Sequence, residues 1–262
     1  MMLSNHIPHL RYLWLVGASL IAGVMNAMAG GGSFLSFPAL LGMGVAPVQA
    51  NATNTVALWP GQLTSLAALH GDVRRDLLPP VIATSIVGGV SGAVTLLHTQ
   101  QRTFLHMIPW LILGGTLIFG ISGPVSKWLR KRSSDAHRDK PIPALKLAAC
   151  LLPVCFYIGY FGAGGGFLVM TILALFGMED MHKLNAMKVV AAMLSNLCAI
   201  VTFVVNGAVI WHYCLISMVF AAAGGYVGAR MAKRANGEVL RAFVVVTGVV
   251  IAGLFFWKQA HG

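Results

Sequence analysis

The run of glycines in Ala29-Gly30-Gly31-Gly32-Ser33 has a second copy at Gly162-Ala163-Gly164-Gly165-Gly166. Each run interrupts a long apolar segment. Glycine inside a helix is disfavoured by about 1 kcal/mol relative to alanine, so three in succession predict that a helix ends there. In a bilayer, irregular backbone is tolerated only where it is buried in protein or lines a cavity. Two such breaks at matching places in two halves of a membrane protein indicate a substrate site.

The composition is that of an integral membrane protein. Of the 262 residues, 57% are hydrophobic and 10% are charged, and the mean hydropathy is +0.79. Soluble domains carry roughly 25% charged residues. Apolar runs of about 20 residues can cross a hydrocarbon core of about 30 Å, and the chain has room for about eight to ten of them. We therefore expect a multi-pass protein of the cell (inner or plasma) membrane, with the lipid bilayer as its surroundings.

The net charge of +11 does not predict nucleic-acid binding, because the cations cluster in connections between apolar segments. One cluster lies between positions 127 and 146, and another between 230 and 241. Clustered Lys and Arg residues mark the cytoplasmic loops of membrane proteins. We therefore expect 127–143 to be a basic cytoplasmic connection, and we expect no nucleic acid among the partners.

An internal repeat is visible in the positions of several motifs. The matched positions, at separations of 134 to 136, are Gly30 with Gly164, Asn51 with Asn185, Gly71 with Gly207, and Gly88 with Gly224. Motifs held at nearly constant separation indicate a tandem duplication. The predicted division is a first repeat over 1–126 and a second over 144–262, joined by the basic connection within one transmembrane domain. The small residues around Gly88 and Gly224 predict close packing of helices.

We predict an all-α integral membrane protein with two inverted-topology repeats of five helical segments each, and with short broken helices after the Gly runs. Five crossings per repeat place both basic clusters on the cytoplasmic side, as the distribution of cations requires. The alternative is eight full spans, which would put the cluster at 230–241 outside. The expected segments are 10–29, 32–45, 50–70, 77–98 and 104–126, then 144–162, 166–178, 185–206, 209–232 and 238–258.

The positions of the ionisable residues count against several chemistries. All seven acids lie at predicted connections or helix ends, and the nine histidines show no clustered ligand spacing. Proton relays and cation sites in membranes rely on carboxylates within the spans, and a transition-metal path needs a cluster of ligands. No catalytic residue, metal or cofactor is expected, and no phosphate-binding loop for ATP is present. A secondary transporter is favoured. A divalent-cation permease, a membrane-embedded enzyme and a non-transporting subunit of a membrane complex are the alternatives.

The groups left near the predicted midplane are backbone amides and neutral polar side chains. A helix that begins after each Gly run presents free N–H groups and the positive end of its dipole to the break. Such a helix end binds an anion without formal charge. We expect a small anionic substrate to bind between the two repeats, which would rock against each other to give alternating access.

The candidate substrate-binding residues surround the two breaks. Lys188 supplies a positive charge if it faces inward, and it snorkels to the cytoplasmic interface if it does not. Asn51 and Asn185 could alternatively cap their helices. The candidates are Asn26, Gly30, Gly31, Gly32, Ser33, Asn51, Thr53, Asn54, Gly164, Gly165, Gly166, Phe167, Asn185 and Lys188.

These motifs resemble a known family. The run from Gly23 through the glycines to Pro38, followed by Ala50-Asn51-Ala52-Thr53-Asn54, is similar to the signature of the TauE/SafE sulfite exporter family. The stretch from Gly159 to Lys188 resembles that family's second half, and the resemblance covers about residues 12 to 258. It implies a permease that exports small anions such as sulfite, sulfoacetate or other organosulfonates. Asn54 departs from the serine that the family has there. The oligomeric state is open, with a homodimer as one option.

Overall fold

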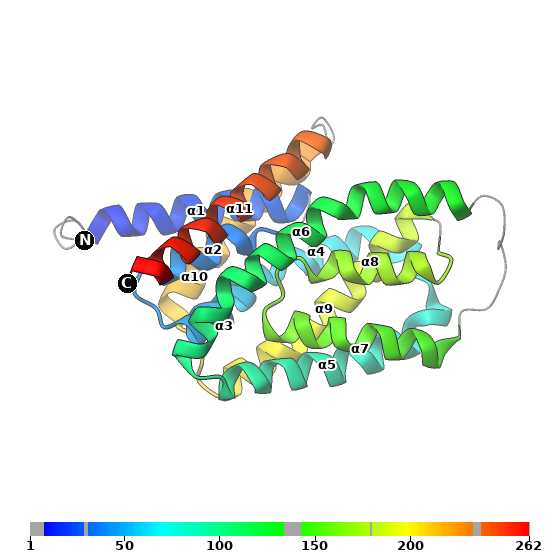
Figure 1. The fold of residues 1–262 in the computed structure, drawn as a ribbon, viewed down its shortest axis with the longest axis horizontal. Coiled ribbons are helices and arrows are strands. Elements are labelled where there is room, and N and C mark those ends of the chain that lie inside the picture. The colour runs from blue at the N-terminus through cyan, green and yellow to red at the C-terminus, as the bar shows by residue number, and fades with distance from the viewer. Residues whose placement is uncertain (1–7, 29–30, 134–142, 179, 233–236, 262) are drawn as a thin grey trace. The chain divides into compact units, whose positions relative to one another are not determined.

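A computed structural model describes residues 8–28, 31–133, 143–178, 180–232 and 237–261. These residues form helices and no strand, as the prediction of an all-α protein requires (Figure 1). The first repeat contains α1 (Pro8–Met28), α2 (Ser33–Gly42), α3 (Pro47–Leu58), α4 (Pro60–Leu69), the short 3-10 helices η1 (His70–Asp72) and η2 (Arg75–Leu77), α5 (Leu78–His98) and α6 (Gln101–Ser133). The second contains α7 (Ala144–Tyr160), α8 (Gly165–Leu175), α9 (Met181–Val205), α10 (Trp211–Ala232) and α11 (Gly237–His261).

The α-helices of the two repeats follow the same order, except at one place. The first repeat has two helices, α3 and α4, where the second has the single long helix α9. The interruption falls at Trp59, immediately before Pro60. Proline lacks an N–H donor and its ring clashes with the preceding turn, so it ends a helix. The equivalent position in α9 is Leu194, which allows that helix to continue.

Helix α6 differs from its predicted extent. We expected the apolar segment to end at position 126 and a basic connection to follow. The helix instead continues to Ser133 and includes the first basic residues of that connection. Lys and Arg are good helix formers, so the end of the apolar run was no guide to the end of the helix.

The chain forms two compact units that do not coincide with the two repeats. The first unit comprises Met1–Gly61, Gln100–Ile112 and Gly207–Gly262, and the second comprises Gln62–Thr99 and Leu113–Asn206. Each unit therefore combines helices of both repeats. In the first unit α1 packs along α10, and in the second α7 packs along α5. The first expected segment of one repeat thus pairs with the fourth expected segment of the other in both units.

The predicted packing role of the small residues is confirmed in each unit. A Cβ atom at Gly92 of α5 would lie 2.2 Å from the carbonyl oxygen of Phe156 in α7. A Cβ atom at Gly224 of α10 would lie 1.9 Å from the carbonyl oxygen of Leu20 in α1. These helices approach so closely that no side chain fits between their backbones, as at other membrane helix crossings with small residues.

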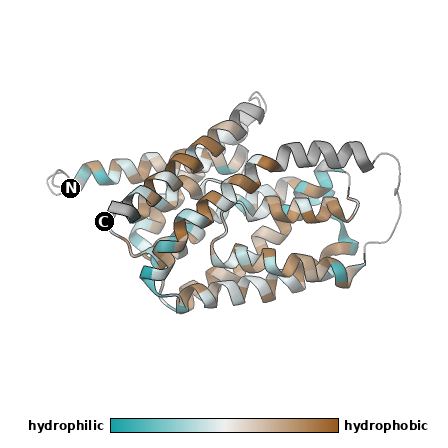
Figure 2. Cartoon of the chain, viewed as in Figure 1, coloured by the Kyte–Doolittle hydropathy of each residue, from teal (hydrophilic) through white to brown (hydrophobic). Residues whose placement is uncertain are grey.

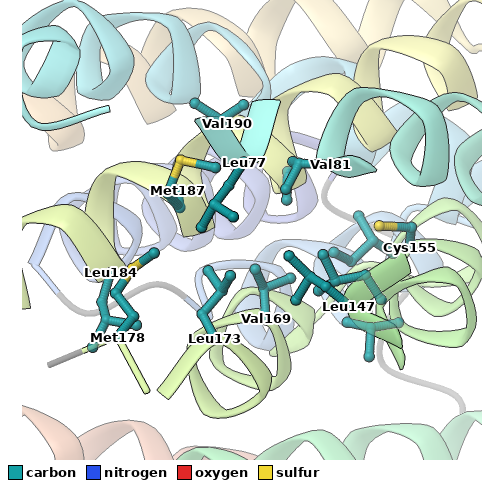
Figure 3. Close-up of a cluster of buried hydrophobic side chains, with 14 residues drawn as sticks. Leu77, Val81, Leu147, Cys155, Val169, Leu173, Met178, Leu184, Met187 and Val190 are labelled. Carbon is teal, nitrogen blue, oxygen red and sulfur yellow. The ribbon is translucent and has the colours of Figure 1, made fainter. Parts of the chain in front are cut away.

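Apolar side chains of the second unit fix the position of α8. Figure 3 shows the cluster, in which Val169 and Leu173 of α8 meet Leu147 of α7 and Met187 of α9. Close-packed interiors of this kind transmit strain and resist rearrangement. The start of α8 is therefore held by its neighbours α7 and α9.

Three described helical segments are long and apolar enough to cross a membrane: His9–Ala27, Arg75–His98 and His182–Val205. Shorter apolar helices are Ser33–Gly42, Ala144–Tyr160, Gly165–Leu175 and Val245–Trp257 (Figure 2). The two short helices that follow the Gly runs, α2 and α8, are among these. This agrees with the expectation of short helices after the breaks.

Candidate functional site

The predicted break in the second repeat is present. Helix α7 ends at Tyr160 and α8 begins at Gly165. Gly162 has a φ of +80° and Gly164 a φ of +79°, a left-handed conformation that only glycine adopts without strain. The backbone of Gly164 also lies against that of Gly115 in α6, and a Cβ atom there would be 3.1 Å from the Gly115 oxygen. The glycines therefore serve both the turn and the packing around it.

The start of α8 leaves backbone donors available. Gly165 donates its N–H to the oxygen of Gly162 (3.3 Å), and Phe167 donates to that of Gly164 (3.1 Å). The N–H groups of Gly164 and Gly166 find no acceptor in the part of the chain that the structure describes. Free amides at the positive end of a helix dipole favour negative charge.

Lys188 of α9 lies directly against this helix end. A Cβ atom on Gly166 would be 3.1 Å from Cγ and 3.3 Å from Cδ of Lys188. The ammonium group lies 5.5 Å from the centre of the Phe167 ring. Lys188 keeps some accessible surface, while protein packs densely around its charged end. Among the described residues no carboxylate forms an ion pair with it. The structure thus brings Gly166, Phe167 and Lys188 together.

An amide pair lies on the other side of the break. The Oδ1 atom of Asn196 would be 3.6 Å from a Cβ atom on Gly162. The Nδ2 group of Asn196 donates to Oε1 of Gln62 at 3.2 Å. Gln62 was missed by the sequence analysis. Its position in the repeat could have identified it, because Gln62 and Asn196 are 134 residues apart and are therefore equivalent residues of the two repeats.

The break in the first repeat has a different packing. Helix α1 ends at Met28 and α2 begins at Ser33, with Gly31 at a φ of +93° between them. Gly30 lies outside the described residues. A Cβ atom at Gly32 would lie 2.2 Å from the carbonyl oxygen of Ala22 in α1. Gly32 is therefore required for the close approach of α2 to α1.

The polar residues of α3 are engaged within the first unit. Asn51, Thr53 and Asn54 are all buried. The hydroxyl of Ser36 in α2 donates to Oδ1 of Asn54. The hydroxyl of Thr53 accepts from the backbone N–H of Ile210 at 3.0 Å. Ser36 was not among the predicted site residues, although it is the partner of one of them.

The capping interpretation of Asn51 and Asn185 is wrong. Helix α3 begins at Pro47 and α9 at Met181, so both asparagines lie inside their helices. Asp180 caps α9 instead, where its carboxylate accepts from the N–H groups of His182 (2.8 Å) and Lys183 (3.4 Å). These hydrogen bonds lower the pKa of Asp180 below its usual value.

The remaining predicted residues lie beside the breaks in sequence. Asn26 is in the last turn of α1 and Ser33 is the first residue of α2, and both are half-buried. Asn26, Gly31–Ser33, Asn51, Thr53 and Asn54 belong to the first unit, and Gly164–Phe167, Asn185 and Lys188 belong to the second. The expectation that both breaks contact one anion stays a prediction. In the described residues no three His, Cys, Asp or Glu side chains form a group that could hold a metal ion.

Comparisons with known proteins give relatives along almost the whole chain. It is 28% identical to "Probable membrane transporter protein YfcA" of Escherichia coli K12, over 93% of this chain and 88% of that protein. It is 27% identical to "Probable membrane transporter protein ORF9" of Sinorhizobium sp., over 91% of this chain and 90% of that one. A Haemophilus influenzae protein described as a probable membrane transporter is 26% identical over 97% and 96% of the two chains. No solved structure matches.

The family model for the sulfite exporter TauE/SafE matches residues 15–255, which include both glycine breaks and Lys188. The chain therefore belongs to the TauE/SafE family, and it is a membrane transporter rather than an enzyme.

Proposed function

We propose that this protein is a secondary transporter of a small sulfur-containing anion, such as sulfite, sulfoacetate or another organosulfonate. It would act as a multi-pass protein of the cell (inner) membrane. The observation that carries the proposal is the position of Lys188 against the first turn of α8, with no carboxylate partner in the described residues. Ionisable residues within membrane spans are costly, so they mark substrate pathways.

The chemistry of the α8 break suits a sulfonate or sulfite head group. Such a group has three oxygen atoms that accept hydrogen bonds, and it carries a negative charge. The N–H groups of Gly164 and Gly166 would donate to two of them, and the ammonium of Lys188 would supply the charge. Hydrogen bonds between ionised partners are roughly twice as strong as neutral ones. The break would therefore hold the anion without any metal.

We also propose the inverted arrangement of the two repeats. The hydrogen bond between Gln62 and Asn196 supports it, because it joins a residue to its own equivalent in the other repeat. Contacts of this self-complementary kind are typical of two copies related by a two-fold rotation. Inverted repeats rock against each other to expose a substrate site to either side of the membrane in turn.

The proposal is tested by transport in proteoliposomes of the purified chain. We expect saturable uptake of ³⁵S-sulfite, competed by unlabelled sulfonates and not by Ni²⁺. Lys188→Met should lower uptake at least tenfold, because the charge that attracts the anion is lost. Lys183→Met is the matched control, since Lys183 lies on the same helix but is exposed and paired with Asp180 at 3.8 Å.

Two results would contradict the proposal. Competition by Ni²⁺ rather than by anions would favour the divalent-cation permease. An absence of any flux, from a chain that is folded and correctly inserted, would favour the non-transporting subunit.

A further inference from the structure

The two breaks are equivalent in sequence but not in chemistry. A shift of 134 positions places Asn54 of α3 at the position of Lys188 in α9. The same shift places Ser36 of α2 at the position of Met170 in α8. One break therefore has a hydroxyl and an amide where the other has a thioether and an ammonium.

The break in the first repeat is neutral, and two polar side chains beside it form a hydrogen bond with each other. Ser36 and Asn54 are buried and hydrogen-bonded together. The Ser36 hydroxyl also lies 3.2 Å from the oxygen of Gly32, at the start of α2. The backbone of Gly32 is in turn covered by α1. A charged group at this break would meet no cation among these residues, and it would have to compete with an existing hydrogen bond.

The break in the second repeat has the opposite character. Met170 provides no hydroxyl to engage Lys188, and the described residues provide no carboxylate. Lys188 is half-buried, and its ammonium lies beside the first turn of α8, 5.5 Å from the centre of the Phe167 ring and within the apolar segment His182–Val205. An unpaired charge in such surroundings is unfavourable until an anion neutralises it. A single anionic group is sufficient for that.

We propose that Lys188 alone recognises the substrate's charge, so that the transporter selects anions with one charged head group over anions with two. This rests on the function proposed above and narrows its substrate class. A singly charged sulfonate or hydrogen sulfite leaves no charge unpaired beside Lys188. A second anionic group, as in sulfoacetate, brings a charge for which the α8 break offers no further cationic side chain beside Lys188 among the residues that the structure describes there.

The test compares two inhibitors of nearly the same size in proteoliposomes. Isethionate and sulfoacetate both carry a sulfonate on a two-carbon chain, but the first ends in a hydroxyl and the second in a carboxylate. Both compete against labelled methanesulfonate. We expect sulfoacetate to inhibit at least tenfold more weakly than isethionate. Equal or stronger inhibition by sulfoacetate would overturn this inference and leave the proposed function intact. Failure to carry or bind any of these anions would overturn both.

Variants at Lys188 separate its charge from its packing. Lys188→Asn gives the second break the residue of the first, and it should weaken inhibition by both sulfonates at least tenfold. Lys188→Arg keeps the charge, and it should keep the preference for isethionate. Lys183→Asn is the control on the same helix, expected to behave like the wild type. Thermal unfolding in detergent shows that each variant is folded. An unchanged inhibition profile in folded Lys188→Asn would overturn the inference.

Discussion

Gly32 and Gly166, which are equivalent in the two repeats, should respond differently to substitution by alanine. At Gly32 an added Cβ atom would lie 2.2 Å from the backbone oxygen of Ala22. Because α1 and α2 would have to separate by about 1 Å, we expect Gly32→Ala to destabilise the fold by about 1–3 kcal/mol, as overpacking does. At Gly166 the nearest atom is Cγ of Lys188, at 3.1 Å. This long side chain can move aside, and alanine favours the helix by up to about 1 kcal/mol.

The assay is thermal unfolding of the purified chain in detergent, followed by tryptophan fluorescence. One kcal/mol corresponds to about 2–4 °C for a chain of this length. Gly32→Ala should thus unfold roughly 2–12 °C below the wild type, while Gly166→Ala should unfold near the wild-type temperature. Gly166→Ala should instead weaken sulfite binding, because the stem of Lys188 is displaced. Wild-type stability in Gly32→Ala, or an equal loss in both variants, would refute the reasoning about these two breaks.

Three further perturbations follow from the contacts. Gly164→Ala should lower the free energy of unfolding by about 1–2 kcal/mol, because φ at Gly164 is +79°. A melting temperature equal to that of the wild type would contradict this. The double variant Gln62→Leu/Asn196→Leu should lose less stability than the sum of the losses in the two single variants, with a coupling of about 0.5–1.5 kcal/mol. Additive losses in this double-mutant cycle would contradict the hydrogen bond. The pKa of Asp180 is lowered in the folded chain. The ionised carboxylate should therefore stabilise α9 fully at a pH above the usual pKa of 3.8, and this stabilisation should be lost as the pH falls through the lower pKa of the folded chain. The acid unfolding curve of Asp180→Ala should therefore differ from that of the wild type only at neutral and mildly acidic pH.

Most of the helices could be predicted from the sequence, because apolar runs and glycines determine where a helix forms and where it ends through local effects. The predicted segment 77–98 corresponds to α5, which spans Leu78–His98, and both Gly runs interrupt helices as expected. The prediction of a single segment over 50–70 was wrong, because Pro60 divides it into α3 and α4, as proline ends a helix. The exchange of helices between the repeats within each compact unit could not be read from the sequence, since it depends on which helices pack together.

The candidate site was predicted in part for the same reason. The pattern of breaks identified Gly164–Phe167, and the repeat identified Lys188 as the position of a possible charge. The contact between Lys188 and Gly166 depends on how α9 packs against α8, and no local pattern contains that information. The alternative that Asn51 caps its helix was wrong: asparagine favours caps, but α3 begins at Pro47, four residues earlier.

Selenite is a close analogue of sulfite, and its selenium atom scatters anomalously. A crystal structure of the chain soaked with selenite therefore shows whether the α8 break binds the anion. We expect an anomalous peak at the first turn of α8, within contact of Lys188 and the amides of Gly164 and Gly166. A peak elsewhere in the protein, with this helix end left empty, would contradict it.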